Sequence, residues 1–140
     1  MDAFEWALQA TELGAGELMV TSIDREGSGN GFDLDLIRRI ATTVPIPVIA
    51  CGGAGNLQHI QEVISDGAAD AVSVASIVHY ECLDKFVYED DEFSTEGNIE
   101  FLRGRTRSSR IPGVTIKEIK NHLISCGIEC RPVERENVGV

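Results

Sequence analysis

Apolar and polar positions follow two different periods along the first 76 residues. Apolar residues spaced three and four apart predict a helix over residues 2–13, another after Asp33 and a third after Asn56. Each helix is followed by a short run that is mostly apolar, and such runs are typical of strands covered on both faces of a parallel sheet. These runs lie at 17–22, 47–51 and 71–76. The repeated order of helix and strand predicts an α/β fold.

Capping residues mark where several of these helices begin. Asp33 and Asn56 each stand before an apolar periodic stretch, where a side-chain oxygen can accept a hydrogen bond from a free N–H. A last helix is predicted over 115–127, with Thr115 as its cap and Glu118 three residues later.

The chain is predicted to be one domain over residues 1–140, with βα units in 1–80, a charged insertion in 81–114, a closing helix in 115–131 and a tail in 132–140. The insertion is rich in acidic residues and then in arginines. Two interpretations stay open for it. It is either a solvated excursion whose opposite charges pair, or a lid or partner-binding segment.

Composition narrows the classes of function. A net charge of −11 argues against nucleic acid as the main partner, and the absence of an 18-residue apolar run argues against a membrane span. The first residues, "MDAFEWALQATE", have two acids and no basic residue, which is not typical of a signal peptide. The spacing of the four cysteines matches no zinc or redox motif. We therefore expect a cytoplasmic protein with free thiols and with no metal or cofactor.

The stretch "ACGGAGN" (50–56) joins the second strand to the third helix. Gly52 and Gly53 let the main chain approach a ligand closely, because no Cβ stands in the way. Free N–H groups at a helix start favour an anion, most often phosphate. The stretch is neither the G-x-G-x-x-G fingerprint nor a P-loop. The alternative is a tight turn that binds nothing.

The next strand ends in Ala75 and Ser76, which can begin a short helix. A Gly-Gly turn after one strand and a small turn after the next is how (β/α)8 barrels hold phosphate. We therefore predict a phosphate site formed by Gly52, Gly53, Ala75 and Ser76.

Three stretches carry a family resemblance: "GAGELMVTSIDREGSGNGFDLDLI", "PVIACGGAGNLQHIQEVISDGAADAVSVASIVHY" and "TIKEIKNHLISCGIECR". They resemble the C-terminal part of the cyclase subunit of imidazole glycerol phosphate synthase, a (β/α)8 (TIM) barrel of histidine biosynthesis. That subunit receives ammonia from a glutaminase partner and cleaves and cyclises a bis-phosphorylated ribulosyl aminoimidazole. The resemblance covers 4–80 and 115–131 and implies a partial barrel with strands six to eight.

The resemblance also implies roles for single residues. It adds Gly27 to the phosphate site and places Thr21 and Cys51 near the substrate. Glu17 matches an acidic residue at the mouth of the family's ammonia passage. This chain has Glu26 where the family usually has Asp, and Cys51 where it commonly has Ser.

The family's acid/base aspartates lie on its first and fifth strands, which match nothing in this chain. Asp24 and Glu26 remain as possible catalytic carboxylates, but they share one loop. General acid–base chemistry on a large substrate needs groups on opposite sides of the reacting atoms. We therefore expect the chain to be inactive alone. For Asp24, bracing its loop and taking part in chemistry are both open.

Three functions follow from these expectations. The chain is one part of an assembled cyclase, or a related cyclase-like barrel that amidates a sugar, or a phosphate-binding or interaction domain without catalysis. The expected partners are a phosphorylated small molecule and either a glutaminase subunit or a complementary half-barrel. Free edges on a three-stranded sheet also predict a homo-oligomer.

Aromatic and histidine residues receive simpler interpretations. Phe4 and Trp6 are predicted to be packing groups of the first helix. His59 and His122 are predicted to be surface residues on helices, and His79 to be structural.

Overall fold

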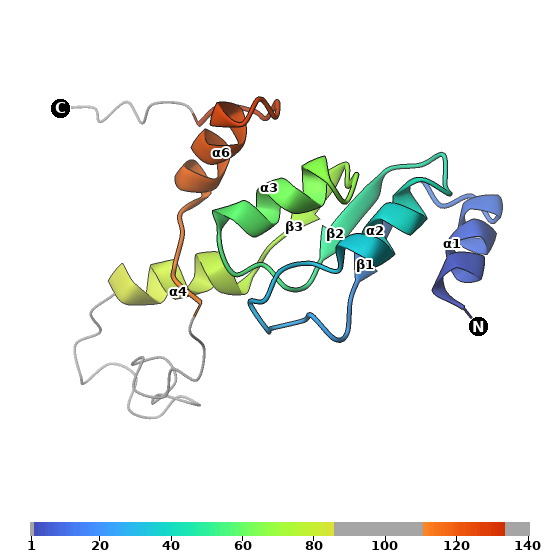
Figure 1. The fold of residues 1–140 in the computed structure, drawn as a ribbon, viewed down its shortest axis with the longest axis horizontal. Helices are drawn as coiled ribbons and strands as arrows, with labels where there is room; N and C mark the ends of the chain where they lie inside the picture. The colour runs from blue at the N-terminus through green and yellow to red at the C-terminus, as the bar shows by residue number, and fades with distance from the viewer. Residues whose placement is uncertain (1, 86–110, 134–140) are drawn as a thin grey trace.

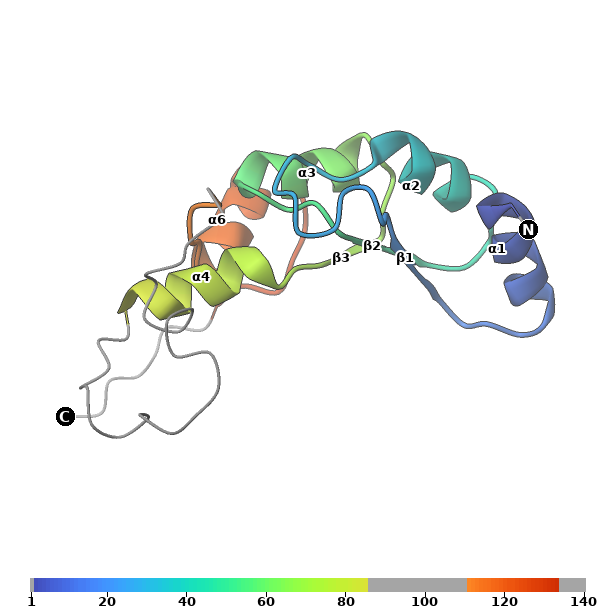
Figure 2. The same ribbon diagram turned by 90° about the horizontal axis from the view of Figure 1, so that it is seen from below.

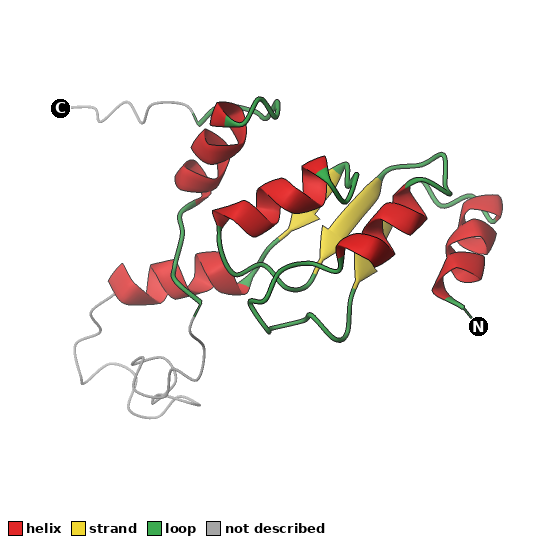
Figure 3. Cartoon of the chain, viewed as in Figure 1, coloured by secondary structure: helices red, strands yellow, loops and turns green. Residues whose placement is uncertain are grey.

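The computed structural model describes residues 2–85 and 111–133, and in them helices and strands alternate from the N-terminus (Figures 1 and 3). The elements are α1 (Ala3–Glu12), β1 (Leu18–Thr21), α2 (Leu34–Ala41), β2 (Val48–Cys51), α3 (Leu57–Ser65), β3 (Ala71–Ser73), α4 (Ser76–Lys85) and α6 (Ile116–Ser125).

The three strands form one parallel sheet in the order β1-β2-β3. Leu18 pairs with Val48, and Ile49 pairs with Ala71. The α/β fold with three parallel strands is therefore as predicted. The third strand is shorter than the predicted 71–76, because the chain leaves the sheet after Ser73 and Ser76 already begins α4.

The predicted caps are confirmed. Asp33 accepts a hydrogen bond from Leu36 N–H at 3.1 Å, and Asn56 accepts one from His59 N–H at 2.9 Å. Thr115 and Glu118 form a reciprocal capping box at the start of α6. Three helices therefore start where their local sequence directs them to start.

One face of the sheet carries the core. Helices α2 and α3 lie along this face, and α6 packs against α3 (Figure 2). Most buried side chains come from the sheet and from these helices, and others come from α1, α4 and the connecting loops. The largest fully buried side chains are Ile37, Val48, Ile60, Val63 and Ile77.

The other face of the sheet is crossed by no described helix or strand (Figure 2). Side chains alternate along a strand, so Met19, Ile49 and Ala71 form one row on this face. Met19 is 64% exposed, whereas Val48 on the opposite face of the neighbouring strand is fully buried. We call the face with Met19, Ile49 and Ala71 the open face.

The predicted insertion, 81–114, begins and ends within described structure. Residues 81–85 belong to α4. At the other end, Val114 N–H donates to Ile77 O at 2.9 Å, and Ile111 and Val114 are buried. Residues 86–110, which make up most of the predicted charged insertion, lie outside the described residues. Most of the predicted tail, residues 134–140, also lies outside them.

The two aromatic residues of α1 differ. Phe4 packs against the core and has the Arg39 guanidinium 3.6 Å from its ring centre. Trp6 is 51% exposed, so its prediction as a packing group is wrong. Among the described elements, α1 has its main contact with α2, so much of the surface of α1 has no neighbouring element to cover it.

Candidate functional site

Two glycine-containing loops meet at the carboxyl ends of the strands. One follows β1 (residues 22–33) and the other follows β2 (residues 52–56). Gly31 N–H donates to Gly53 O at 2.8 Å, which joins the loops through their main chains. Gly29 and Gly55 approach so closely that a Cβ on Gly55 would stand 1.9 Å from Gly29 O. We call this joined pair the glycine loops.

Glycine is required at the centre of the second loop for two reasons. Gly52 and Gly53 have φ values of +89° and +111°, a region that other residues rarely adopt. A Cβ on Gly53 would also stand 2.2 Å from Gly31 O. The backbone conformation and the contact between the loops both exclude a side chain there.

The start of α4 lies beside this turn. Val78 N–H and His79 N–H both donate to Ala75 O, so Ala75 occupies the cap position and Ser76 the first helical position. Within the described part of the chain, the N–H groups of Gly52, Gly53, Ala75 and Ser76 find no hydrogen-bond acceptor. Backbone donors of this kind, with the positive end of a helix dipole, suit an anion.

A small cavity lies between the glycine loops and α4. Its volume is about 50 Å³, and one water needs roughly 10–15 Å³ of such space, so it has room for a single small group. The structure brings together here most of the residues that the sequence singles out. The lining includes Glu26, Gly27, Cys51, Gly52, Gly53, Ala75 and Ser76, with Gly29, Ala54, Ser73, Val74 and Ile111 completing it.

Three other predicted residues do not line this cavity. Thr21 is the exposed last residue of β1 and pairs with Cys51. Asp24 is exposed and accepts no hydrogen bond from any described residue, so bracing of its loop is not observed. Glu17 precedes β1, at the end of the strand opposite the cavity, and is exposed.

Glu26 adds negative charge at the cavity. Its Oε2 would be 2.8 Å from a Cβ placed on Gly52, so the carboxylate lies against the turn that offers free N–H groups. The side chain is exposed and therefore has room to move. A bound anion has to share this space with the carboxylate or displace it.

Sequence reasoning missed three residues at this site. Gly29 contacts the second loop, and Ile111 brings an apolar wall from the far side of the charged segment. His59 is half-buried and bonded to the second loop, so its prediction as a surface residue is wrong. The one available signal for His59 was its position four residues after Gly55, which is one helical turn.

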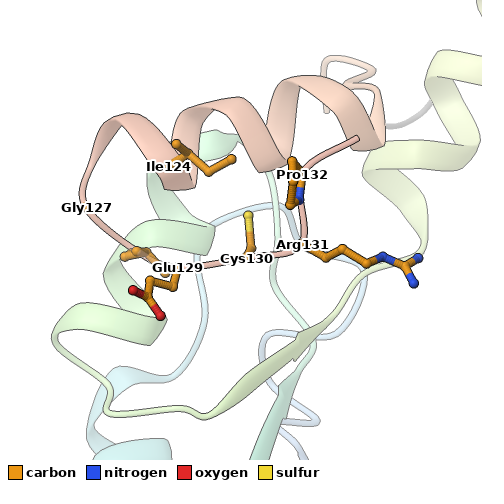
Figure 4. Close-up of a pocket in the computed structure, with 7 residues that line it drawn as sticks. Ile124, Gly127, Glu129, Cys130, Arg131 and Pro132 are labelled. Carbon is orange, nitrogen blue, oxygen red and sulfur yellow. The ribbon is translucent and has the colours of Figure 1, made fainter. Parts of the chain in front are cut away.

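A larger hollow of about 690 Å³ follows α6 (Figure 4). Ile124, Gly127 and Pro132 contribute to its walls. The side chains of Glu129 and Arg131 point away from each other in Figure 4, so their charges do not converge on one ligand position. Size alone therefore does not make this hollow the better candidate.

No group of three or more His, Cys, Asp or Glu side chains gathers as metal ligands within residues 2–85 and 111–133. None of the helices in these ranges combines the length and the apolar content that crossing a membrane requires. The four cysteines are unpaired thiols, two of them half-buried and two exposed.

A family profile described as "Histidine biosynthesis protein" matches residues 1–84, which is more than half of the chain. The chain belongs to the histidine biosynthesis family. In this family member, the three parallel strands with their helices form a partial (β/α)8 barrel. The glycine loops and the start of α4 lie at the carboxyl ends of the strands, where barrels of this fold carry their ligand sites.

The histidine biosynthesis family member is also similar to a chain in the crystal structure of the Amycolatopsis orientalis BexX/CysO complex. The similarity covers 51% of this chain and 29% of that chain, at 29% sequence identity and a TM-score of 0.46. The chain therefore spans less than a third of the length of that chain.

Proposed function

We propose that this chain is the phosphate-binding part of a barrel of the imidazole glycerol phosphate synthase cyclase type. It holds one phosphate group of a phosphorylated small molecule between the glycine loops and the start of α4. Catalysis requires further strands, supplied by the rest of a longer chain or by a complementary half-barrel.

The observation that carries the proposal is the set of unbonded N–H groups around one small cavity. Gly52, Gly53, Ala75 and Ser76 offer these groups, and the Ser76 hydroxyl adds a further donor. A hydrogen bond to a charged acceptor contributes about 1.5–3 kcal/mol. Several such bonds outweigh the net charge of −11, because salt screens distant carboxylates beyond about 8–10 Å.

The cyclase assignment within the family rests on the resemblance of the "TSIDREG" and "GGAG" stretches. Apart from Thr21, the last residue of β1, both stretches lie in the glycine loops, and residues of both line the same cavity. Glu26 replaces the family's usual Asp at its edge. The longer side chain moves the carboxylate by about one bond and leaves the backbone donors in place.

We expect the chain to be inactive without further strands because of where its candidate catalytic carboxylates lie. Asp24 and Glu26 belong to the one loop between β1 and α2, so both approach a substrate from the same segment of the chain. Acid and base on opposite sides of a substrate therefore require groups from elsewhere. A complementary half-barrel would supply them, and a glutaminase subunit would supply ammonia on the side of Glu17.

Ser76 offers a sharp test of phosphate binding. Proline fits the first position of a helix, so Ser76→Pro removes one N–H group with little cost to α4. Ser76→Ala removes only the hydroxyl and is the matched control. We expect inorganic phosphate to shift the amide NMR signals of Gly52, Gly53 and Ala75 in the natural chain. Ser76→Pro should weaken binding about tenfold or more, and Ser76→Ala less.

Largest shifts away from these residues would show that the site is elsewhere. The requirement for further strands is tested separately by measuring ammonia-dependent cyclase turnover of the purified chain. We expect none alone and recovery of some turnover with a separately produced N-terminal half-barrel. A steady rate that scales with the concentration of this chain alone would contradict the requirement.

A further inference from the structure

His59, on the first turn of α3, contacts both glycine loops. Its Nδ1 lies 3.2 Å from Gly55 N, and Gly55 N–H donates this hydrogen bond. The ring also packs against the first loop, since its Cδ2 and Nε2 lie 3.5 and 3.6 Å from where a Cβ on Gly31 would stand. One side chain therefore touches the second loop through a hydrogen bond and the first through packing.

The bond to Gly55 has a structural consequence for the turn. Gly55 is buried, and its main chain is pressed against Gly29 O. A buried N–H without an acceptor is unfavourable, so the turn needs an acceptor at this position. The imidazole Nδ1 is that acceptor. We infer that neutral His59 is a positioning residue that holds the glycine turn in its anion-binding shape; the inference rests on the proposed function.

The acceptor role fixes the protonation state of the ring. Gly55 N–H can only donate, so Nδ1 must carry its lone pair and the imidazole must be neutral. Nε2 lies 3.2 Å from Asn56 Nδ2, which is also a donor atom. With its lone pair on Nδ1, the neutral ring already carries its proton on Nε2, and an imidazolium adds a second proton on Nδ1, against the Gly55 N–H. Protonation of His59 therefore breaks the bond that holds Gly55.

The charged groups on the surrounding elements form no ion pair with His59 in the described structure. Glu62 on the same helix accepts a hydrogen bond from Gln58 at 3.2 Å. Asp33, at the end of the first loop, accepts from Leu36 N–H and from the Ser22 hydroxyl. Asp24, Arg25 and Glu26 on that loop are exposed. No ion pair joins any of these groups to His59 in the described structure, so none stabilises an imidazolium there.

The direction in which anion affinity changes with pH distinguishes this positioning role from electrostatic attraction between an imidazolium and the anion. A positive imidazolium near the cavity would strengthen anion binding as the pH falls. Loss of the Gly55 bond would weaken it instead. Histidine takes up its proton near neutral pH, so the range from pH 7.5 to 5.5 is the informative one.

Sulfate is the suitable probe, because it keeps its double charge throughout this range, whereas phosphate does not. We expect the affinity of the natural chain for sulfate to fall about fivefold between pH 7.5 and pH 5.5. His59→Asn places an amide oxygen near the position of Nδ1, so it should keep the bond and bind with little pH dependence. His59→Phe keeps the packing on Gly31 without the acceptor and should bind weakly at both pH values. His122→Asn, on α6, should keep the natural pH profile.

Amide NMR gives a second measurement that needs no ligand. The Gly55 and Gly53 signals should move between pH 7.5 and pH 5.5, and this movement should be absent in His59→Asn. An affinity that rises at low pH, or an unchanged pH dependence in His59→Asn, would overturn the role of His59. No binding of sulfate or phosphate at pH 7.5 would instead overturn the proposed function, and the amide titration would still decide whether His59 holds Gly55.

Discussion

The carboxyl ends of the strands and the open face of the sheet differ in how completely the described residues pack around them. At the carboxyl ends of the strands, the glycine loops and the start of α4 pack main chain against main chain and leave only a small cavity. On the open face, Met19 is 64% exposed and no described element covers it. The first region is built from consecutive βα units, whereas the second needs contacts from outside them.

This difference follows from where each region finds its partners. The glycine loops come from segments about 20–30 residues apart, and the parallel register brings them together. The interior of a barrel is filled in layers by side chains from alternate strands around the whole ring. Three strands can therefore bring the glycine loops together without forming a packed barrel interior.

Gly53→Ala should have the largest effect on the completed region. The new Cβ would meet Gly31 O at 2.2 Å, and the backbone would keep an unfavourable φ of +111°. We expect loss of phosphate binding and a decrease of about 2 kcal/mol or more in the free energy of unfolding. Phosphate titration by NMR and urea unfolding measure the two effects.

Gly14→Ala is the matched control for Gly53→Ala. Gly14 also has a positive φ, of +97°, but a Cβ there would have no atom within 4 Å. We expect a smaller loss of stability, about 1 kcal/mol, and unchanged phosphate binding. Equal effects of the two substitutions on binding would show that the contact between the loops is not what shapes the site.

Met19→Lys tests the open face. We expect the natural chain to self-associate at micromolar concentration, because no described strand pairs with the outer edges of β1 and β3 and the row of Met19, Ile49 and Ala71 is apolar. A charge on that face, at Met19 of the edge strand β1, should weaken association about tenfold or more, while folding is unaffected, since Met19 is already exposed. Sedimentation equilibrium measures the change.

Ile124→Lys provides the control, because Ile124 is exposed on α6 and lies outside the open face. It should leave the association constant unchanged. A natural chain that sediments as a monomer over the same concentrations would contradict self-association. An equal loss in both variants would place the contact on another surface.

Glu26→Gln should give the smallest change, and in the opposite direction. It removes a negative charge that lies against Gly52 while it keeps the length of the side chain. We expect the affinity for phosphate to rise about threefold at low salt and less at high salt, since the group is exposed. Calorimetric titration at two salt concentrations would show this, and a weaker affinity would mean that Glu26 supports the bound anion.

Most of the fold was predictable because its signals are local. Asp33, Asn56 and the pair of Thr115 and Glu118 each bond within three residues, so the sequence places those helix starts correctly. Strand ends were less predictable. Val74 and Ala75 look like strand in sequence, but the chain leaves the sheet there to begin α4. Trp6 looked like core because its burial depends on neighbours that a sequence pattern does not reveal.

The gathering of the candidate site residues was predictable for a different reason. Parallel strands present their carboxyl ends on one side, so Gly27, Gly52 and Ser76 had to lie near one another. Ile111 was not predictable, because the chain returns to the cavity only after the charged segment. His59 was missed because its role depends on a bond to Gly55 that only the loop geometry creates.

Amide hydrogen exchange with and without phosphate tests the contrast between the two regions most directly. If the cavity is a completed anion site, phosphate should slow exchange at Gly52, Gly53, Ala75 and Ser76 and leave the free edges of β1 and β3 unchanged. Unchanged exchange at those four amides, or protection that appears mainly along the strand edges, would contradict the account.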